Sequence, residues 1–79
     1  MDITTAVRIR ISELCQARNI TINKLGTICG VTQSTIKNIM YGRNGATVST
    51  IKKLCDGLEI DIIEFFNTDL FKDLEQEIK

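Results

Sequence analysis

The stretch of sequence that decides the fold is ITINKLGTICGVTQSTIKNIMYGRN, residues 20–44. Two short segments within it, 22–29 and 33–41, carry apolar residues at helical spacing and are separated by Gly30 and its neighbours. Glycine readily adopts the left-handed backbone conformation that ends a helix. The stretch therefore predicts two short helices joined by a turn of three or four residues.

The apolar positions of the two segments predict which side of each helix faces a core. In the first segment, three residues are expected to point inward: Leu25, Ile28 and Cys29. In the second segment the buried stripe can be only Ile36 and Ile39, with Met40 beside it. The polar residues of this second helix must then look outward or along its edges, and they are Gln33, Ser34, Lys37, Asn38 and Tyr41.

Threonines stand where helix N-caps are expected. Thr21, Thr32 and Thr47 each precede a helical pattern, and a hydroxyl at that place can accept a hydrogen bond from the first turn. Thr47 introduces a helix over 48–58, with apolar residues three or four apart: Val48, Ile51, Leu54, Cys55 and Leu58. A helix over 5–18, following Thr4 or Thr5 as its cap, is predicted from Val7, Ile11 and Leu14.

The C-terminal part of the chain predicts a short helix introduced by Asp61 and running to Phe66. A last segment, 69–78, carries four apolar residues on one side: Leu70, Phe71, Leu74 and Ile78. With 79 residues, no proline and no linker, the chain has room for one domain, residues 1–79. We expect an all-α fold with a core over 5–66 and a C-terminal helical extension over 67–79.

Composition argues against several classes of protein. The chain has no histidine, and its three cysteines, Cys15, Cys29 and Cys55, are widely spaced without a CxxC pair. We therefore expect no metal site, no cofactor, no disulfide and no enzymatic activity, since no cysteine has a visible base beside it. No apolar run is long enough to span a membrane or to act as a secretory signal, so the expected location is the cytoplasm.

The formal net charge of zero hides a strong asymmetry along the chain. Residues 1–53 contain eight basic and two acidic side chains, a net charge of +6, and residues 54–79 contain two basic and eight acidic ones, a net charge of −6. The basic residues of the first part are Arg8, Arg10, Arg18, Lys24, Lys37, Arg43, Lys52 and Lys53. This distribution favours a basic face for phosphates and an acidic end kept away from them.

The polar side of segment 33–41 adds a more specific signal. Gln and Asn can bind adenine through two hydrogen bonds, Lys suits the acceptors of guanine, and Ser can serve several bases. Two short helices joined by a glycine-containing turn fit a helix-turn-helix, whose second helix lies in the DNA major groove.

Residues 20–44 together with TVSTIKKLCDGLEIDIIEFF, residues 47–66, resemble the lambda repressor and Cro-like helix-turn-helix family, also called the XRE family. The resemblance covers about residues 7–66. It rests on the order and spacing of Val7, Ile11, Leu14, Leu25, Gly30, Val31, Ile36, Ile39, Gly42, Ile51, Leu54, Leu58 and Phe65. It implies a compact five-helix DNA-binding domain that usually binds operator DNA as a homodimer.

The resemblance also implies residue roles. The Gln33–Ser34 pair is similar to the Gln–Ser pair that opens the recognition helix of the repressor that gives the family its name. The expected base contacts are Gln33, Ser34, Lys37, Asn38 and Asn44. The expected phosphate contacts are Thr21, Lys24, Thr32, Thr35, Tyr41 and Arg43. Two alternatives stay open, since Tyr41 could instead shield the core and Asn44 could be only a turn former.

Three departures from the family pattern have structural consequences. Cys15 and Met40 stand where many relatives have an arginine and a glutamate that form a partly buried ion pair, and we expect these two apolar side chains to touch. Ile22 replaces a glutamine that commonly opens the second helix and braces the first glutamine of the recognition helix. Glu59 stands where glycine or asparagine often caps the fourth helix, so that junction is expected to be wound differently or strained.

The function indicated is sequence-specific DNA binding in transcription regulation, most simply repression, by a homodimer. The apolar residues of segment 69–78 either fold back onto the chain's own core or pack against a second copy, and we favour the second copy because a single module contacts few bases. An alternative class is an interaction module that holds a protein partner through its acidic end. An antitoxin would combine both roles.

Overall fold

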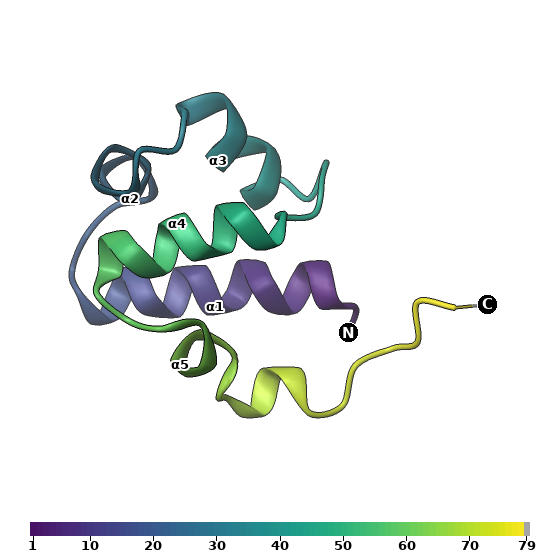
Figure 1. Ribbon diagram of the computed structural model, residues 1–79. Helices are drawn as coiled ribbons and strands as arrows, with labels where there is room; N and C mark the ends of the chain where they lie inside the picture. The colour runs from purple at the N-terminus through teal and green to yellow at the C-terminus, as the bar shows by residue number, and fades with distance from the viewer. Residues whose placement is uncertain (79) are drawn as a thin grey trace.

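A computed structural model describes residues 1–78, and the regular secondary structure of this part of the chain is all helical, without a strand (Figure 1). The elements are α1 (Ile3–Ala17), α2 (Ile22–Cys29), α3 (Gln33–Met40), α4 (Val48–Leu58), α5 (Ile62–Phe66) and a short 3-10 helix, η1 (Asp69–Phe71). The predicted all-α architecture of five helices is confirmed, but of the helical extension expected over 67–79 only η1 forms within the described residues.

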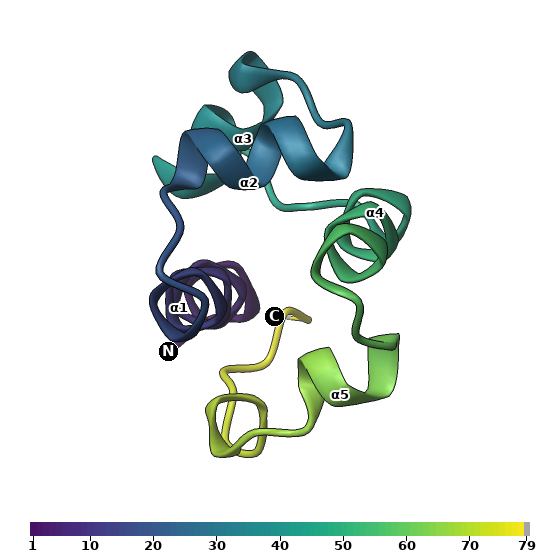
Figure 2. The ribbon, with the colours of Figure 1, turned by 90° about the vertical axis from the view of Figure 1, so that its left-hand side faces the viewer.

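The five helices surround one apolar core. In Figure 2 both α1 and α4 are seen nearly end-on, α2 and α3 lie across one end of the molecule, and α5 lies at the opposite end. Each helix places at least one almost completely buried side chain in the centre: Ile11, Leu25, Ile36, Leu54 and Phe65. Because every helix contributes to the same cluster, the position of α2 and α3 is set by packing against the rest of the domain.

Side-chain caps fix where the helices begin. Thr21, Thr32 and Thr47 each accept a hydrogen bond from the backbone N–H three residues later, at 3.0–3.1 Å, as the sequence predicted. Helix α1 begins two residues earlier than predicted, because the cap is the Asp2 carboxylate and not Thr4 or Thr5. Asp2 accepts from the Thr5 N–H at 2.8 Å, and this bond lowers the pKa of the carboxyl group.

Left-handed backbone conformations end or follow the helices. Gly30 (φ +68°), as predicted, and Gly42 (φ +75°) adopt them without steric cost. Glu59 adopts the same conformation (φ +59°) at the end of α4 although it carries a side chain. The junction is therefore wound as a glycine would wind it, and the strain expected from the sequence is present.

Two apolar residues are more exposed than the sequence pattern indicated. Ile28 was expected to face inward, but it is 44 % exposed, because the buried side of α2 runs through Leu25 and Gly26. Val48 belongs to the apolar pattern of α4 yet is 76 % exposed at the first position of the helix. Spacing alone therefore identified both helices, although it overstated the width of their buried faces.

The C-terminal segment folds back onto its own chain. After η1, residues 72–78 form no further helix, and the Phe71 ring packs 4.8 Å from the Phe66 ring and 6.3 Å from the Phe65 ring, centroid to centroid. The backbone N–H of Glu75 donates to the Met1 carbonyl at 3.0 Å, which joins the two ends of the chain. For Phe71 the structure thus adopts the alternative that the sequence analysis disfavoured, since burial against its own core is available within the chain.

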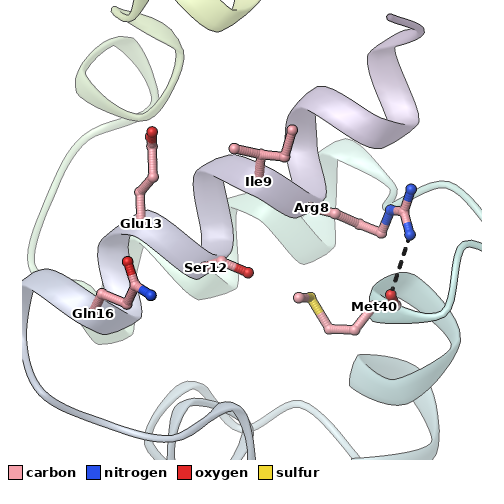
Figure 3. A pocket seen from close by; sticks show the side chains of 6 residues that line it. All are labelled: Arg8, Ile9, Ser12, Glu13, Gln16 and Met40. Carbon is pink, nitrogen blue, oxygen red and sulfur yellow. Dashed lines mark hydrogen bonds between the residues drawn. The ribbon is translucent and has the colours of Figure 1, made fainter.

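Two arginines of α1 and Arg18, the residue that follows it, hold the C-terminal ends of three other helices. The last carbonyls of a helix have no partner within it, and a guanidinium group can supply one. Arg10 donates to Phe65 O at 2.7 Å and Glu64 O at 2.9 Å in α5, Arg18 to Leu58 O at 3.2 Å in α4, and Arg8 to Met40 O at 3.5 Å in α3 (Figure 3). Helix α1 thereby ties the domain together through polar as well as apolar contacts.

Candidate nucleic-acid interface

Helices α2 and α3 and the turn between them form the predicted helix-turn-helix. Gly30 ends α2, Val31 is buried in the turn, and Thr32 begins α3. Ile36 and Ile39 are buried as predicted, and Met40 is half-buried beside them. The opposite side of α3 is consequently turned away from the core.

The predicted base-contacting residues lie on or next to this outer side. Gln33, Ser34 and Lys37 are exposed on α3, and Asn44 is exposed in the loop that follows it. Asn38 is half-buried, and its backbone carbonyl accepts from the N–H of Arg43 at 3.0 Å. This bond holds the start of the loop against the C-terminal end of α3. The backbone that carries Asn44 is therefore fixed relative to the helix.

The predicted phosphate-contacting residues surround the same helix. Thr21, Lys24, Thr32 and Thr35 are exposed at the N-terminal ends of α2 and α3. In α3 the Thr32 hydroxyl donates to the Thr35 hydroxyl at 2.8 Å. Helix N-termini carry free N–H groups and a partial positive charge, both of which attract phosphate.

Tyr41 and Arg43 lie at the other end of α3. Tyr41 is 66 % exposed, so it does not shield the core. The guanidinium of Arg43 lies 5.5 Å from the centre of the Tyr41 ring, a cation–π distance. The two side chains therefore form an exposed pair beside the loop that carries Asn44.

The helix-turn-helix and its loop carry only positive charge. Residues 20–47 contain Lys24, Lys37 and Arg43 and no acidic residue, a net charge of +3. The larger excess of residues 1–53 includes Arg8, Arg10 and Arg18, which keep their charge but donate to the carbonyls at the ends of α3, α5 and α4. Lys52 is bonded to Asp56, an interaction that raises the pKa of the lysine. Three cations on an acid-free surface are the electrostatic core of the candidate interface.

One contact within the interface was missed by the sequence analysis. The side-chain Nε2 of Gln33 donates to the backbone carbonyl of Asn23 in α2 at 3.1 Å. The contact that a glutamine at position 22 makes with this side chain in relatives is here replaced by a contact with the α2 backbone. The signal in the sequence was Gly26, a glycine inside a helix, which leaves room for the Gln33 side chain.

Nothing in residues 1–78 has the geometry of a metal centre, since no group of three or more potential ligands gathers there. Cys15 and Cys55 are buried and Cys29 is half-buried, and burial raises the pKa of all three thiols. A shallow hollow between α1 and the end of α3 is lined by Arg8, Ile9, Ser12, Glu13, Gln16 and Met40 (Figure 3). No helix in the described part of the chain has the length and hydrophobicity needed to cross a membrane.

The fold and the exposed polar face of α3 define a helix-turn-helix protein. Comparison with known proteins agrees, because residues 11–65 match the family described as Helix-turn-helix. The chain belongs to this family, in its XRE type, and is a DNA-binding transcription regulator and not an enzyme.

One solved structure shows the likeness over nearly the whole chain. The crystal structure of prophage Lp1 protein 11 superposes with a TM-score of 0.83 at 32 % sequence identity. The alignment covers 94 % of this chain and 100 % of that chain. No curated protein sequence matches the chain.

Proposed function

We propose that the 79 residues form one domain that binds operator DNA sequence-specifically as a homodimer and represses transcription. The observation that carries this proposal is the outer side of α3, which is exposed, polar and free of acidic residues over 33–41. A solvated helix with no partner usually carries both acidic and basic residues in i, i+4 pairs. Operator binding takes place where the DNA is, so we also propose a cytoplasmic location.

Base reading is assigned to five side chains on α3 and its loop: Gln33, Ser34, Lys37, Asn38 and Asn44. Gln33 and Ser34 stand in the first turn of α3, the part of a recognition helix that enters the major groove. Lys37 lies one turn further along, on the same exposed side. Asn38 is half-buried and would reach a base only from the edge of the helix.

Phosphate binding is assigned to Thr21, Lys24, Thr32, Thr35, Tyr41 and Arg43. These residues lie at both ends of α3 and at the start of α2, so they flank the base-reading side chains along the interface. Such contacts fix the register of a protein on DNA without reading sequence. Each neutralised phosphate lowers the slope of log K against log salt by about 0.9.

Dimerisation is proposed because one copy offers a single short recognition helix. A two-fold dimer would place two such helices about 34 Å apart, one turn of DNA. Four residues of the C-terminal segment were expected to make the contact, but Phe71 is packed against its own chain and is removed from that set. The surface left for a second copy consists of Ile78, which is 88 % exposed, and the outer sides of the half-buried Leu70 and Leu74.

A second candidate function is capture of a protein partner, alone or combined with operator binding as in an antitoxin. The favouring observation is the acidic end of the chain, which contains Glu59, Asp61 and Glu64 around α5. Ile63 in the same helix is 77 % exposed. In Figure 2 this end lies opposite α2 and α3, so one molecule could use both surfaces at once.

The proposal is tested by selecting bound duplexes from a random DNA pool with the wild-type protein and with Gln33→Ala. Glu64→Gln, an exposed change far from α3, serves as the control. Three results together support a dimeric operator-binding protein. The wild type selects a palindromic motif, Gln33→Ala but not Glu64→Gln loses one base preference in each half-site, and binding weakens steeply as the salt concentration rises. Failure of the wild type to enrich any motif at low salt contradicts it and favours the protein-partner function.

A further inference from the structure

The side chain of Gln33 is held in one orientation before any DNA is present. Its Nε2 lies 3.1 Å from the backbone carbonyl of Asn23. A carbonyl oxygen can only accept a hydrogen bond, so the nitrogen of the amide must face Asn23 and Oε1 must face away from it. An exposed glutamine on a helix surface would otherwise sample many rotamers.

Gly26 makes this orientation possible. A Cβ atom at position 26 would stand 3.0 Å from Gln33 Nε2 and 3.1 Å from the Val31 carbonyl oxygen, closer than such atoms normally approach. Gly26 has an ordinary helical backbone, since Gly30 and Gly42 are the glycines with positive φ among the described residues. A glycine within a helix weakens that helix, so the close approach of α3, and not the backbone conformation, is the reason for it.

We propose that Gly26 and the Asn23 carbonyl form a seat that presets Gln33 to read adenine. The inference rests on the proposed function, because it names the base read by one residue of the same interface. With one N–H bonded to Asn23, the amide retains one N–H donor and the Oε1 acceptor. Adenine alone presents an acceptor, N7, beside a donor, N6–H, in the major groove, whereas guanine presents two acceptors there.

The seat matters because it removes part of the cost of binding. Ordering a long polar side chain at an interface weakens binding, and a side chain already ordered in the free protein avoids that penalty. Gly26 is therefore a positioning residue that acts on DNA through Gln33. A methyl group at position 26 should displace the mobile end of the Gln33 side chain, and the Val31 carbonyl must also shift by a few tenths of an ångström.

The test measures the DNA affinity of the wild type, Gly26→Ala, Thr27→Ala and Gln33→Ala. The first duplex carries the selected motif, and the others are changed at the one base pair that Gln33→Ala no longer discriminates. The wild type should prefer adenine there by about tenfold, within the range of a bidentate contact. Gly26→Ala should reduce the preference to roughly threefold or less while it still unfolds cooperatively, because the gain in helix propensity offsets part of the strain at the Val31 carbonyl. Thr27→Ala is the matched control on α2, because its hydroxyl also donates to the Asn23 carbonyl, at 3.2 Å, and it should retain the preference.

Two further measurements keep the inference falsifiable if Gly26→Ala folds poorly. In the free wild-type protein, the Gln33 side-chain NH₂ protons should show NOEs to α2 and restricted motion, and a freely rotating amide overturns the seat. In the Gln33→Ala background, adding Gly26→Ala should leave the remaining base preferences unchanged. A wild type that selects no motif defeats the proposed function, whereas a wild type and a folded Gly26→Ala that discriminate equally defeat only the inference.

Discussion

Arg10 offers the sharpest test of how the domain is held together. Its Nε donates to Phe65 O at 2.7 Å and its Nη2 to Glu64 O at 2.9 Å, and its side chain is only 15 % exposed. Replacement by methionine keeps most of the aliphatic packing but removes both donors. The part-buried Phe65 oxygen then loses its partner, whereas the Glu64 oxygen still accepts from the Asn67 N–H at 3.4 Å.

The expected loss follows from these two bonds. A hydrogen bond from a charged donor contributes about 1.5–3 kcal/mol when buried, and we take about 1.5 kcal/mol for the part-buried bond to Phe65. The bond to Glu64 is exposed and is assigned about 0.5–1 kcal/mol. Arg10→Met should therefore lower the free energy of unfolding by about 2–2.5 kcal/mol, which corresponds to roughly 8–20 °C in Tm for a domain of this size.

Urea denaturation followed by circular dichroism measures this loss as a lower midpoint at an unchanged m-value. Glu13→Gln is the control, because Glu13 lies 3.7 Å from Arg10 Nη1 and is 49 % exposed, and such a pair contributes less than about 0.5 kcal/mol. Arg10→Lys should fall between the two, since a lysine can donate to one of the carbonyls. An Arg10→Met protein within about 0.5 kcal/mol of wild type would refute the assignment of Arg10 as the cap of α5.

Three further outcomes are expected. Glu59→Gly should raise the free energy of unfolding by about 0.5–1 kcal/mol in the same urea titration, because the relief of left-handed strain exceeds the entropy that glycine adds to the unfolded chain. Glu59→Ala keeps the strain and should not raise it. Gly57→Ala should lower the free energy of unfolding by about 1–3 kcal/mol, because the new Cβ would overlap Cys29 Sγ and lie 3.1 Å from Cys29 Cα. Adding Cys29→Ala should recover part of this loss. Burial raises the thiol pKa of Cys15, Cys29 and Cys55 above the ordinary 9.0. Their contribution to the free energy of unfolding is therefore complete below pH 9 and falls as the pH rises past it. A Cys55→Ala variant whose free energy of unfolding falls as steeply with pH above 9 would argue against this.

Much of the fold could be predicted because its signals are local. The caps Thr21, Thr32 and Thr47 act on N–H groups three residues away, and Gly30 and Gly42 act on their own backbone. Neither kind of signal depends on the rest of the molecule. The bounds of α2, α3 and α4 and the exposed side of α3 therefore followed from the order of residues, whereas the start of α1 and the end of the C-terminal segment did not.

The tertiary structure decided what depends on partners distant in the chain. Arg10 meets carbonyls more than fifty residues away, so its cationic charge, which the sequence assigned to a basic face, serves to cap a helix. Gln33 meets the backbone of α2 only because Gly26 allows the helices to approach closely. Whether Phe71 would find its own core or a second copy likewise depended on the position of α5. Such contacts require the packed arrangement of the helices, which spacing and local propensity do not encode.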